Sequence, residues 1–120
     1  MKFLLVFLGS GIGGVIRYAI SLGFAPTQLK FPWATFLANI IAAFLVGLFY
    51  ALASQKHWMD KNYLLLLTVG LCGGLSTFST FSIETVKLWQ AQQYGMVILY
   101  IALSITVCMV FTFVGSKLWA

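Results

Sequence analysis

The chain has 120 residues, of which 62% are hydrophobic and only 8% are charged. A soluble domain contains roughly 45–50% apolar residues, so this composition excludes a soluble fold and indicates a single domain embedded in lipid. The net charge of +5 is spread singly along the chain, which excludes the basic patch of a nucleic-acid-binding protein.

The first predicted element is a membrane span at residues 3–24, because about 20 mainly apolar residues are needed to cross the hydrocarbon core. Its start is similar to a signal peptide, but the apolar run continues past Arg17 without a small-residue cleavage site, so we expect a retained span. Gly9 and Gly13 form a GxxxG pattern that lets helices approach closely. Arg17 is expected to snorkel towards the interface.

The second predicted span covers residues 33–54 and follows Pro32, a residue suited to a helix start. Asn39 is the one amide among the apolar neighbours TFLANIIAAF. A polar side chain buried in lipid is costly unless it has a partner, and such residues usually serve a function. Asn39 is therefore a candidate functional residue.

The third predicted span, residues 64–87, has an apolar first half and continues as GGLSTFSTFSIE. Gly73 and Gly74 each cost about 1 kcal/mol in a helix relative to alanine, so a break is expected there, near the middle of the span. Unwound backbone at this depth survives only where protein or water satisfies it. Broken helices of this kind commonly hold ions in transporters.

The segment after the break combines hydroxyl groups with aromatic rings. A helix there would present three rows of side chains: Phe78 with Phe81, Ser79 with Ser82, and Thr77 with Thr80 and Glu84. The hydroxyls could serve only to pack helices together. Five of them between Ser76 and Ser82 exceed what packing needs, and Glu84 is the one acid inside a predicted span.

The fourth predicted span, residues 95–117, carries a polar stripe on one side. Residues able to form hydrogen bonds recur every four positions, at Tyr100, Ser104, Cys108, Thr112 and Ser116. This stripe could be packing, or it could offer successive donors to a small solute. Hydroxyls, an amide and aromatic ring edges all present positive character. Because a carboxylate cluster is missing from the sequence, the lining favours a small anion.

The charges hardly favour one orientation in the membrane. They divide four against three between the two sides, as Lys2, Lys56, Lys61 and Lys117 against Arg17, Lys30 and Lys87. A four-span chain without charge bias can insert both ways up. We therefore expect dual topology and an antiparallel homodimer with a two-fold axis in the membrane plane.

The third-span sequence GLCGGLSTFSTFSIE resembles the signature of the CrcB/Fluc fluoride channels, and GSGIGGVIRY, ATFLANIIAAFLVG and the Tyr-to-Ser spacing of the last span extend the resemblance over the chain. It implies a channel, not an enzyme, that exports cytoplasmic fluoride passively across the cell inner membrane and so reduces fluoride toxicity. It also implies an antiparallel homodimer with two pores. The matching fluoride-pathway positions are Asn39, Phe78, Ser79, Thr80, Phe81, Tyr100, Ser104 and Thr112; Cys108 departs from the usual hydroxyl.

A break also frees backbone carbonyls, which in an antiparallel dimer can converge on the two-fold axis. Neutral oxygen ligands without carboxylates suit a hard monovalent cation better than Ca²⁺ or Mg²⁺. The family resemblance implies that this ion is a structural, untransported Na⁺ held by the carbonyls of Gly73 and Ser76.

Two other classes of protein are considered. A small dual-topology multidrug exporter of the four-span type needs a carboxylate in its first span, where this chain has Arg17. A non-transporting assembly subunit would explain the glycines and hydroxyls as packing, but not their alternation with phenylalanine. An enzyme is the least supported class, because the sequence contains neither a nucleophile–base pair nor a phosphate-binding loop.

Overall fold

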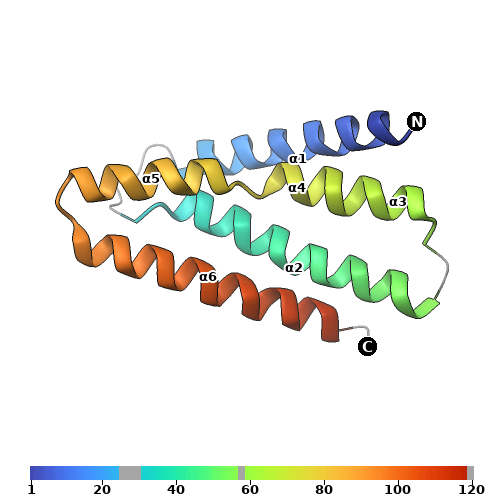
Figure 1. The fold of residues 1–120 in the computed structure, drawn as a ribbon. Coiled ribbons are helices and arrows are strands. Elements are labelled where there is room, and N and C mark those ends of the chain that lie inside the picture. The colour runs from blue at the N-terminus through green and yellow to red at the C-terminus, as the bar shows by residue number, and fades with distance from the viewer. Residues whose placement is uncertain (25–30, 57–58, 119–120) are drawn as a thin grey trace.

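The computed structural model describes residues 1–24, 31–56 and 59–118, which form an all-helical bundle (Figure 1). The elements are α1 (Lys2–Phe24), α2 (Trp33–Lys56), α3 (Lys61–Leu65), the π-helix η1 (Leu66–Cys72), α4 (Gly73–Leu75), α5 (Phe78–Gln90) and α6 (Tyr94–Lys117). Four stretches are long and apolar enough to cross a membrane: Lys2–Phe24, Trp33–Gln55, Lys61–Gln90 and Tyr94–Lys117. The predicted all-α membrane protein with four spanning helices is confirmed.

The four spans run up and down beside one another. The N-terminal end of α1 and the C-terminal end of α6 lie at the end of the bundle where α2 finishes and α3 begins. The turn from α5 to α6 lies at the opposite end (Figure 1). α2 packs along α6, whereas α1 packs along η1 and α4. The two halves of the third span therefore have different neighbours, because α5 contacts α6.

Glycines let the helices approach at backbone distance. A Cβ atom on Gly70 would lie 2.9 Å from the Cα of Gly9, and one on Gly13 would lie 2.7 Å from the amide nitrogen of Leu75. The GxxxG pattern of α1 thus packs against the third span of the same chain. Gly47 and Gly115 make the corresponding close approach between α2 and α6. In lipid, where apolar surface gives little driving force, such contacts supply the attraction between helices.

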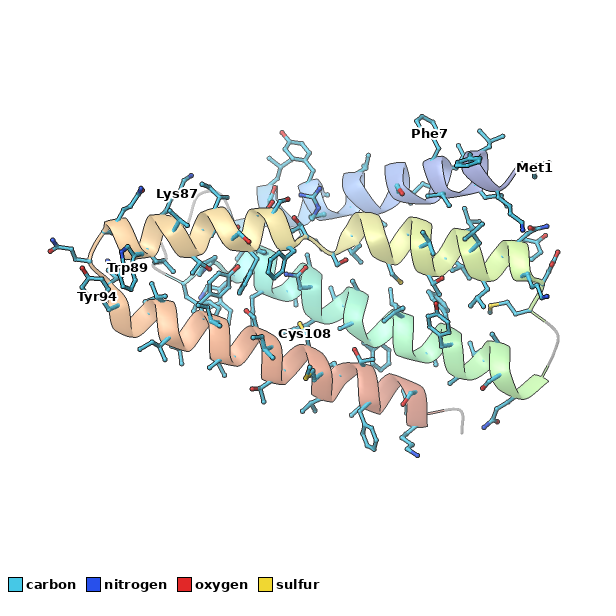
Figure 2. All side chains as sticks on the ribbon, viewed as in Figure 1. Met1, Phe7, Lys87, Trp89, Tyr94 and Cys108 are labelled. Atoms are coloured by element: carbon cyan, nitrogen blue, oxygen red, sulfur yellow. The ribbon has the colours of Figure 1, made fainter. Side chains whose placement is uncertain are left out.

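Large apolar side chains face outward, as expected of a protein whose solvent is lipid. Phe3 is 93% exposed and Phe7 is 72% exposed, and Figure 2 shows Phe7 pointing away from the bundle. The buried cluster is built from small residues and one leucine: Ala38, Ala42 and Leu75. Small side chains at the helix contacts and large ones at the lipid surface are the pattern of a membrane bundle.

The third span is helical from Lys61 to Leu75 and helical again from Phe78. The predicted interruption at Gly73 and Gly74 lies later: Gly73 has helical backbone angles, whereas Ser76 and Thr77 are extended, with ψ of 152° and 117°. Gly74 stays helical, and its missing side chain allows a close approach to α1. A Cβ on Gly74 would collide with the backbone of Ser10 in α1.

Candidate functional site

The extended residues between α4 and α5 are held by Asn39 of α2. The amide N–H of Thr77 donates to Oδ1 of Asn39 at 2.8 Å, and Nδ2 of Asn39 donates to the Thr77 carbonyl at 3.3 Å. Thr77 also caps α5, since its hydroxyl accepts from the amide of Thr80 at 3.2 Å. Asn39, predicted to need a partner in lipid, therefore finds it in backbone that no longer satisfies itself.

These hydrogen bonds remove the amide donors of two carbonyls in the third span. In an uninterrupted helix the amide of Thr77 would donate to Gly73, and the amide of Thr80 would donate to Ser76. Both amides are bound elsewhere, to Asn39 and to the Thr77 hydroxyl. The carbonyls of Gly73 and Ser76, which are expected to bind a cation, therefore lack the amide donors that a continuous helix would supply.

Arg17 makes a contact with the same segment that the sequence patterns did not predict. Its Nε donates to the carbonyl of Gly74 at 3.2 Å. The carbonyls at the end of a helix lack amide partners from the next turn, and a guanidinium can replace them. Arg17 therefore does more than anchor α1 at the interface, because it joins α1 to the end of α4.

Aromatic rings line up next to the interruption. The ring centroids of Phe78 and Phe81 are 5.6 Å apart, and those of Phe81 and Tyr100 are 4.9 Å apart. Phe78 is 80% exposed, whereas Tyr100 is fully buried. The two phenylalanines expected from the sequence to share a face therefore do so, and they lead from the open surface of the chain to the buried tyrosine of α6.

Glu84 lies beyond these rings and is bound by two hydroxyl groups. The hydroxyl of Thr35 donates to one of its carboxylate oxygens, and the hydroxyl of Tyr100 donates to the other at 3.4 Å. Thr35 was not predicted as a site residue. The signal for it lies in its position four residues before Asn39, which places both polar side chains on one face of α2.

A cavity of about 500 Å³ joins most of the predicted fluoride-pathway residues. Those that line it are Asn39, Phe78, Phe81, Ser104 and Thr112, with Cys108, Gly73 and Ser76. Figure 2 shows Cys108 where α6 faces α2. The other three predicted residues lie outside its lining. Ser79 is exposed beside the hydroxyl of Thr77, Thr80 lines a smaller cavity of about 180 Å³ with Arg17 and Glu84, and Tyr100 is buried nearby.

The hydroxyls of the stripe on α6 differ in what they bind. Thr112 donates a hydrogen bond to the carbonyl of Cys108 at 3.0 Å, so its hydroxyl proton is already bound within its own helix. Ser104 is buried, and its Oγ has no hydrogen-bond partner among the residues that the structure describes. Nearly all buried polar groups are hydrogen-bonded, so a hydroxyl on the cavity wall without a partner among the described residues is unusual.

Residues 4–116 match the family model described as CrcB-like protein, Camphor Resistance (CrcB). The chain belongs to the CrcB-like family. Three curated relatives are named fluoride-specific ion channel FluC. That of Azobacteroides pseudotrichonymphae is 39% identical over 87% of this chain and 84% of its own length. That of Phocaeicola vulgatus is 43% identical over 83% of each. That of Serratia proteamaculans is 37% identical over 98% of this chain and 92% of its own length.

Membership of the CrcB-like family agrees with the four spanning helices, and the chain is a multi-pass membrane protein. The resemblance found in the third span is thereby confirmed at the level of the family. The roles of the individual pathway residues stay predictions, now with a geometry against which each can be tested.

Proposed function

We propose that this CrcB-like protein is a fluoride-selective channel that exports cytoplasmic fluoride passively and so reduces fluoride toxicity. The relatives named fluoride-specific ion channel, at 37–43% identity, support this assignment. The observation that carries it is the lining of the 500 Å³ cavity, which combines hydroxyls, an amide and phenylalanine rings and, among the described residues, includes no charged side chain. Such a lining offers positive character to an anion without binding it as tightly as a fixed cation would.

Passive export fits these groups energetically. Fluoride enters an acid-exposed cell as neutral HF and dissociates inside, and an inside-negative potential then drives the anion outward by about 2.3 kcal/mol per 100 mV. The donors have to replace the water that fluoride loses, as carbonyls do for cations in other selective pores. Neither proton coupling nor chemistry on the ion is required, so the protein acts as a channel and not as an enzyme.

A multidrug exporter is the weaker assignment. It requires a carboxylate in the first span, and Lys2–Phe24 contains neither Asp nor Glu. The relatives above are named as fluoride channels as well.

We infer that two copies pair in antiparallel orientation around the interrupted third span. Ser76 and Ser79 are exposed in the single chain, and Phe78 is 80% exposed. Lipid cannot satisfy the hydroxyls and the unwound backbone of such a face, whereas a second copy can. The charge count of four against three supports insertion in both orientations, although Lys30 and the side chain of Lys56 lie outside the described residues. A reporter fused to the C-terminus should be active on both sides of the membrane, and activity on one side alone would contradict this pairing.

The same pairing supports a structural Na⁺ at the dimer centre, held by the carbonyls of Gly73 and Ser76. The helical donors of both carbonyls are diverted to other acceptors, which leaves oxygen atoms of the kind that hard cations prefer. The oxygens offered there are neutral because they belong to backbone carbonyls. Replacement of Na⁺ by a bulky organic cation during purification and assay should abolish fluoride flux, and full flux without Na⁺ would remove the ion from the account.

Reconstitution of the pure protein in liposomes tests the function itself. Vesicles loaded with potassium fluoride should release it when valinomycin lets K⁺ follow, as measured with a fluoride electrode. Vesicles loaded with potassium chloride are the matched control and should retain chloride. Release of both anions at the same rate would contradict a fluoride-selective channel.

A further inference from the structure

Phe31 lies directly before α2, and the sequence patterns assign it no role. Its side chain is nevertheless buried, with 8% of its surface exposed. Its ring contacts those of Trp33 and Phe36, its neighbours along the chain, at centroid distances of 4.6 and 5.2 Å. It also contacts the ring of Tyr100 at 5.3 Å. That last contact joins the segment before α2 to the first third of α6.

The contact between Phe31 and Tyr100 has a defined geometry. The two rings meet edge to face with an angle of 80° between their planes, an arrangement that the charge distribution of aromatic rings favours. On its other side the Tyr100 ring meets Phe81 at 4.9 Å. Tyr100 is therefore held between two phenylalanines, and of these Phe31 is the one outside the predicted fluoride pathway.

The orientation of Tyr100 decides whether its hydroxyl reaches Glu84. That hydrogen bond measures 3.4 Å between the oxygens, beyond the 2.5–3.0 Å usual for such pairs. A small tilt of the ring is enough to strengthen the bond or to break it. Thr35, four residues after Phe31, binds the other oxygen of Glu84. One short segment thus contacts both members of the Tyr100–Glu84 pair.

We propose that Phe31 is a positioning residue, whose edge-to-face contact fixes the tilt of Tyr100 so that the tyrosine hydroxyl is presented to Glu84 beside the anion path. A leucine at this position fills much of the same volume but cannot make this contact between aromatic rings. Tyr100 is then free to adopt more than one orientation. The effect on transport rests on the proposed fluoride conduction, whereas the effect on Tyr100 itself does not.

The first test measures Tyr100 directly. The chain has five tyrosines; after labelling with meta-fluorotyrosine, the fluorine NMR signal of Tyr100 is assigned by its loss in Tyr100→Phe. The wild-type protein should show one Tyr100 signal, and Phe31→Leu should split or broaden it. Phe36→Leu is the matched control and should keep one signal, because the Phe36 ring contacts Phe31 whereas no ring contact between Phe36 and Tyr100 is found among the described residues. A single sharp Tyr100 signal in Phe31→Leu would overturn the proposal whether or not the protein conducts fluoride.

The second test uses fluoride efflux from liposomes and separates positioning from packing. Phe31→Leu should lower flux about 3- to 10-fold, the range that the loss of one aromatic pair allows, while Phe36→Leu changes it less than about twofold. In a Tyr100→Phe background the hydroxyl is already absent, so Phe31→Leu should add little. An equal loss in both backgrounds would show that Phe31 does not act through Tyr100. A wild-type protein without flux would contradict the proposed function, and the NMR result would then decide this inference alone.

Discussion

The two halves of the third span are held in opposite ways. From Leu66 to Leu75 the chain packs against α1 through its backbone, with glycines at the contacts and Leu75 only 2% exposed. From Phe78 onward it is held by side-chain hydrogen bonds and ring contacts, and Phe78 is 80% exposed. The change occurs across two extended residues, Ser76 and Thr77.

We infer from this difference that one half serves as a support and propose that the other is the surface along which an ion moves. Backbone contacts between helices leave no adjustable side chains, so the first half fixes where the interruption lies. Hydroxyls and rings can reorient around an ion, and these are concentrated in the second half and on the facing side of α6. If this division is right, substitutions in the first half should affect folding, and those in the second half should affect flux.

The largest effect is expected at the contact between α1 and the third span. Gly13→Val places a side chain against the backbone of Leu71 and Leu75, where it cannot fit, and should destabilise the protein by at least about 3 kcal/mol or prevent folding. Gly14→Val is the control, because a Cβ there meets nothing within 4 Å. Thermal unfolding in detergent measures both. Equal stability of the two variants would contradict the supporting role of the first half.

In the second half, Phe78→Ile and Phe81→Ile should slow fluoride while the protein stays folded. Isoleucine keeps apolar bulk but removes the positive ring edge, so we expect at least a tenfold loss of flux, about 1.4 kcal/mol in the barrier. Phe113→Ile on α6 is the control, because Phe113 is 61% exposed in the single chain and is not among the described residues that line the cavity. Unchanged flux in both site variants would show that these rings serve only to pack the helices.

At the junction of the two halves, Asn39→Ala should affect both properties moderately. It leaves the amide and the carbonyl of Thr77 without their partner, which should cost about 1–3 kcal/mol of stability. The α5 cap shifts as a result, and flux should fall. Asn62→Ala at the exposed start of α3 is the control and should change neither. A variant at Asn39 with wild-type stability and flux would show that Asn39 does not hold the interruption.

The smallest effect is expected for Ser76→Ala, within the same interruption. The side chain of Ser76 is exposed, and the proposed Na⁺ is bound by its carbonyl, which alanine retains. Flux should change less than about twofold. A large loss, measured in the same vesicles as wild type, would mean that the hydroxyl rather than the backbone does the binding.

The four spans could be predicted from the sequence because each contains a long stretch of high hydropathy. The position of the interruption could not. Gly73 and Gly74 are poor helix formers, yet Gly74 is fixed against Ser10 and stays helical. Within the third span the backbone becomes extended at Ser76 and Thr77, where Asn39, far away in sequence, binds the Thr77 amide. A local propensity is thus overridden by contacts between helices.

The sequence predicted the chemical groups of the candidate site but not the residues that orient them. Hydroxyl groups and aromatic rings within an apolar span can be recognised from a single sequence, as can Asn39 and the polar stripe on α6. The residues that orient them do not: Thr35 is one threonine among many, Phe31 one of 11 phenylalanines. Their importance follows from contacts with Glu84 and Tyr100, which come from other helices.

The most direct test of fluoride movement along this surface is the reversal potential of the current through the protein in a planar bilayer. With fluoride at a tenfold gradient and chloride equal on both sides, a fluoride-selective path predicts a reversal close to 59 mV in magnitude, with the sign of the fluoride gradient. The Phe81→Ile variant should reduce the current in the same bilayers. If chloride permeated equally well and were present in excess, the reversal potential would be close to zero. That result would contradict the account.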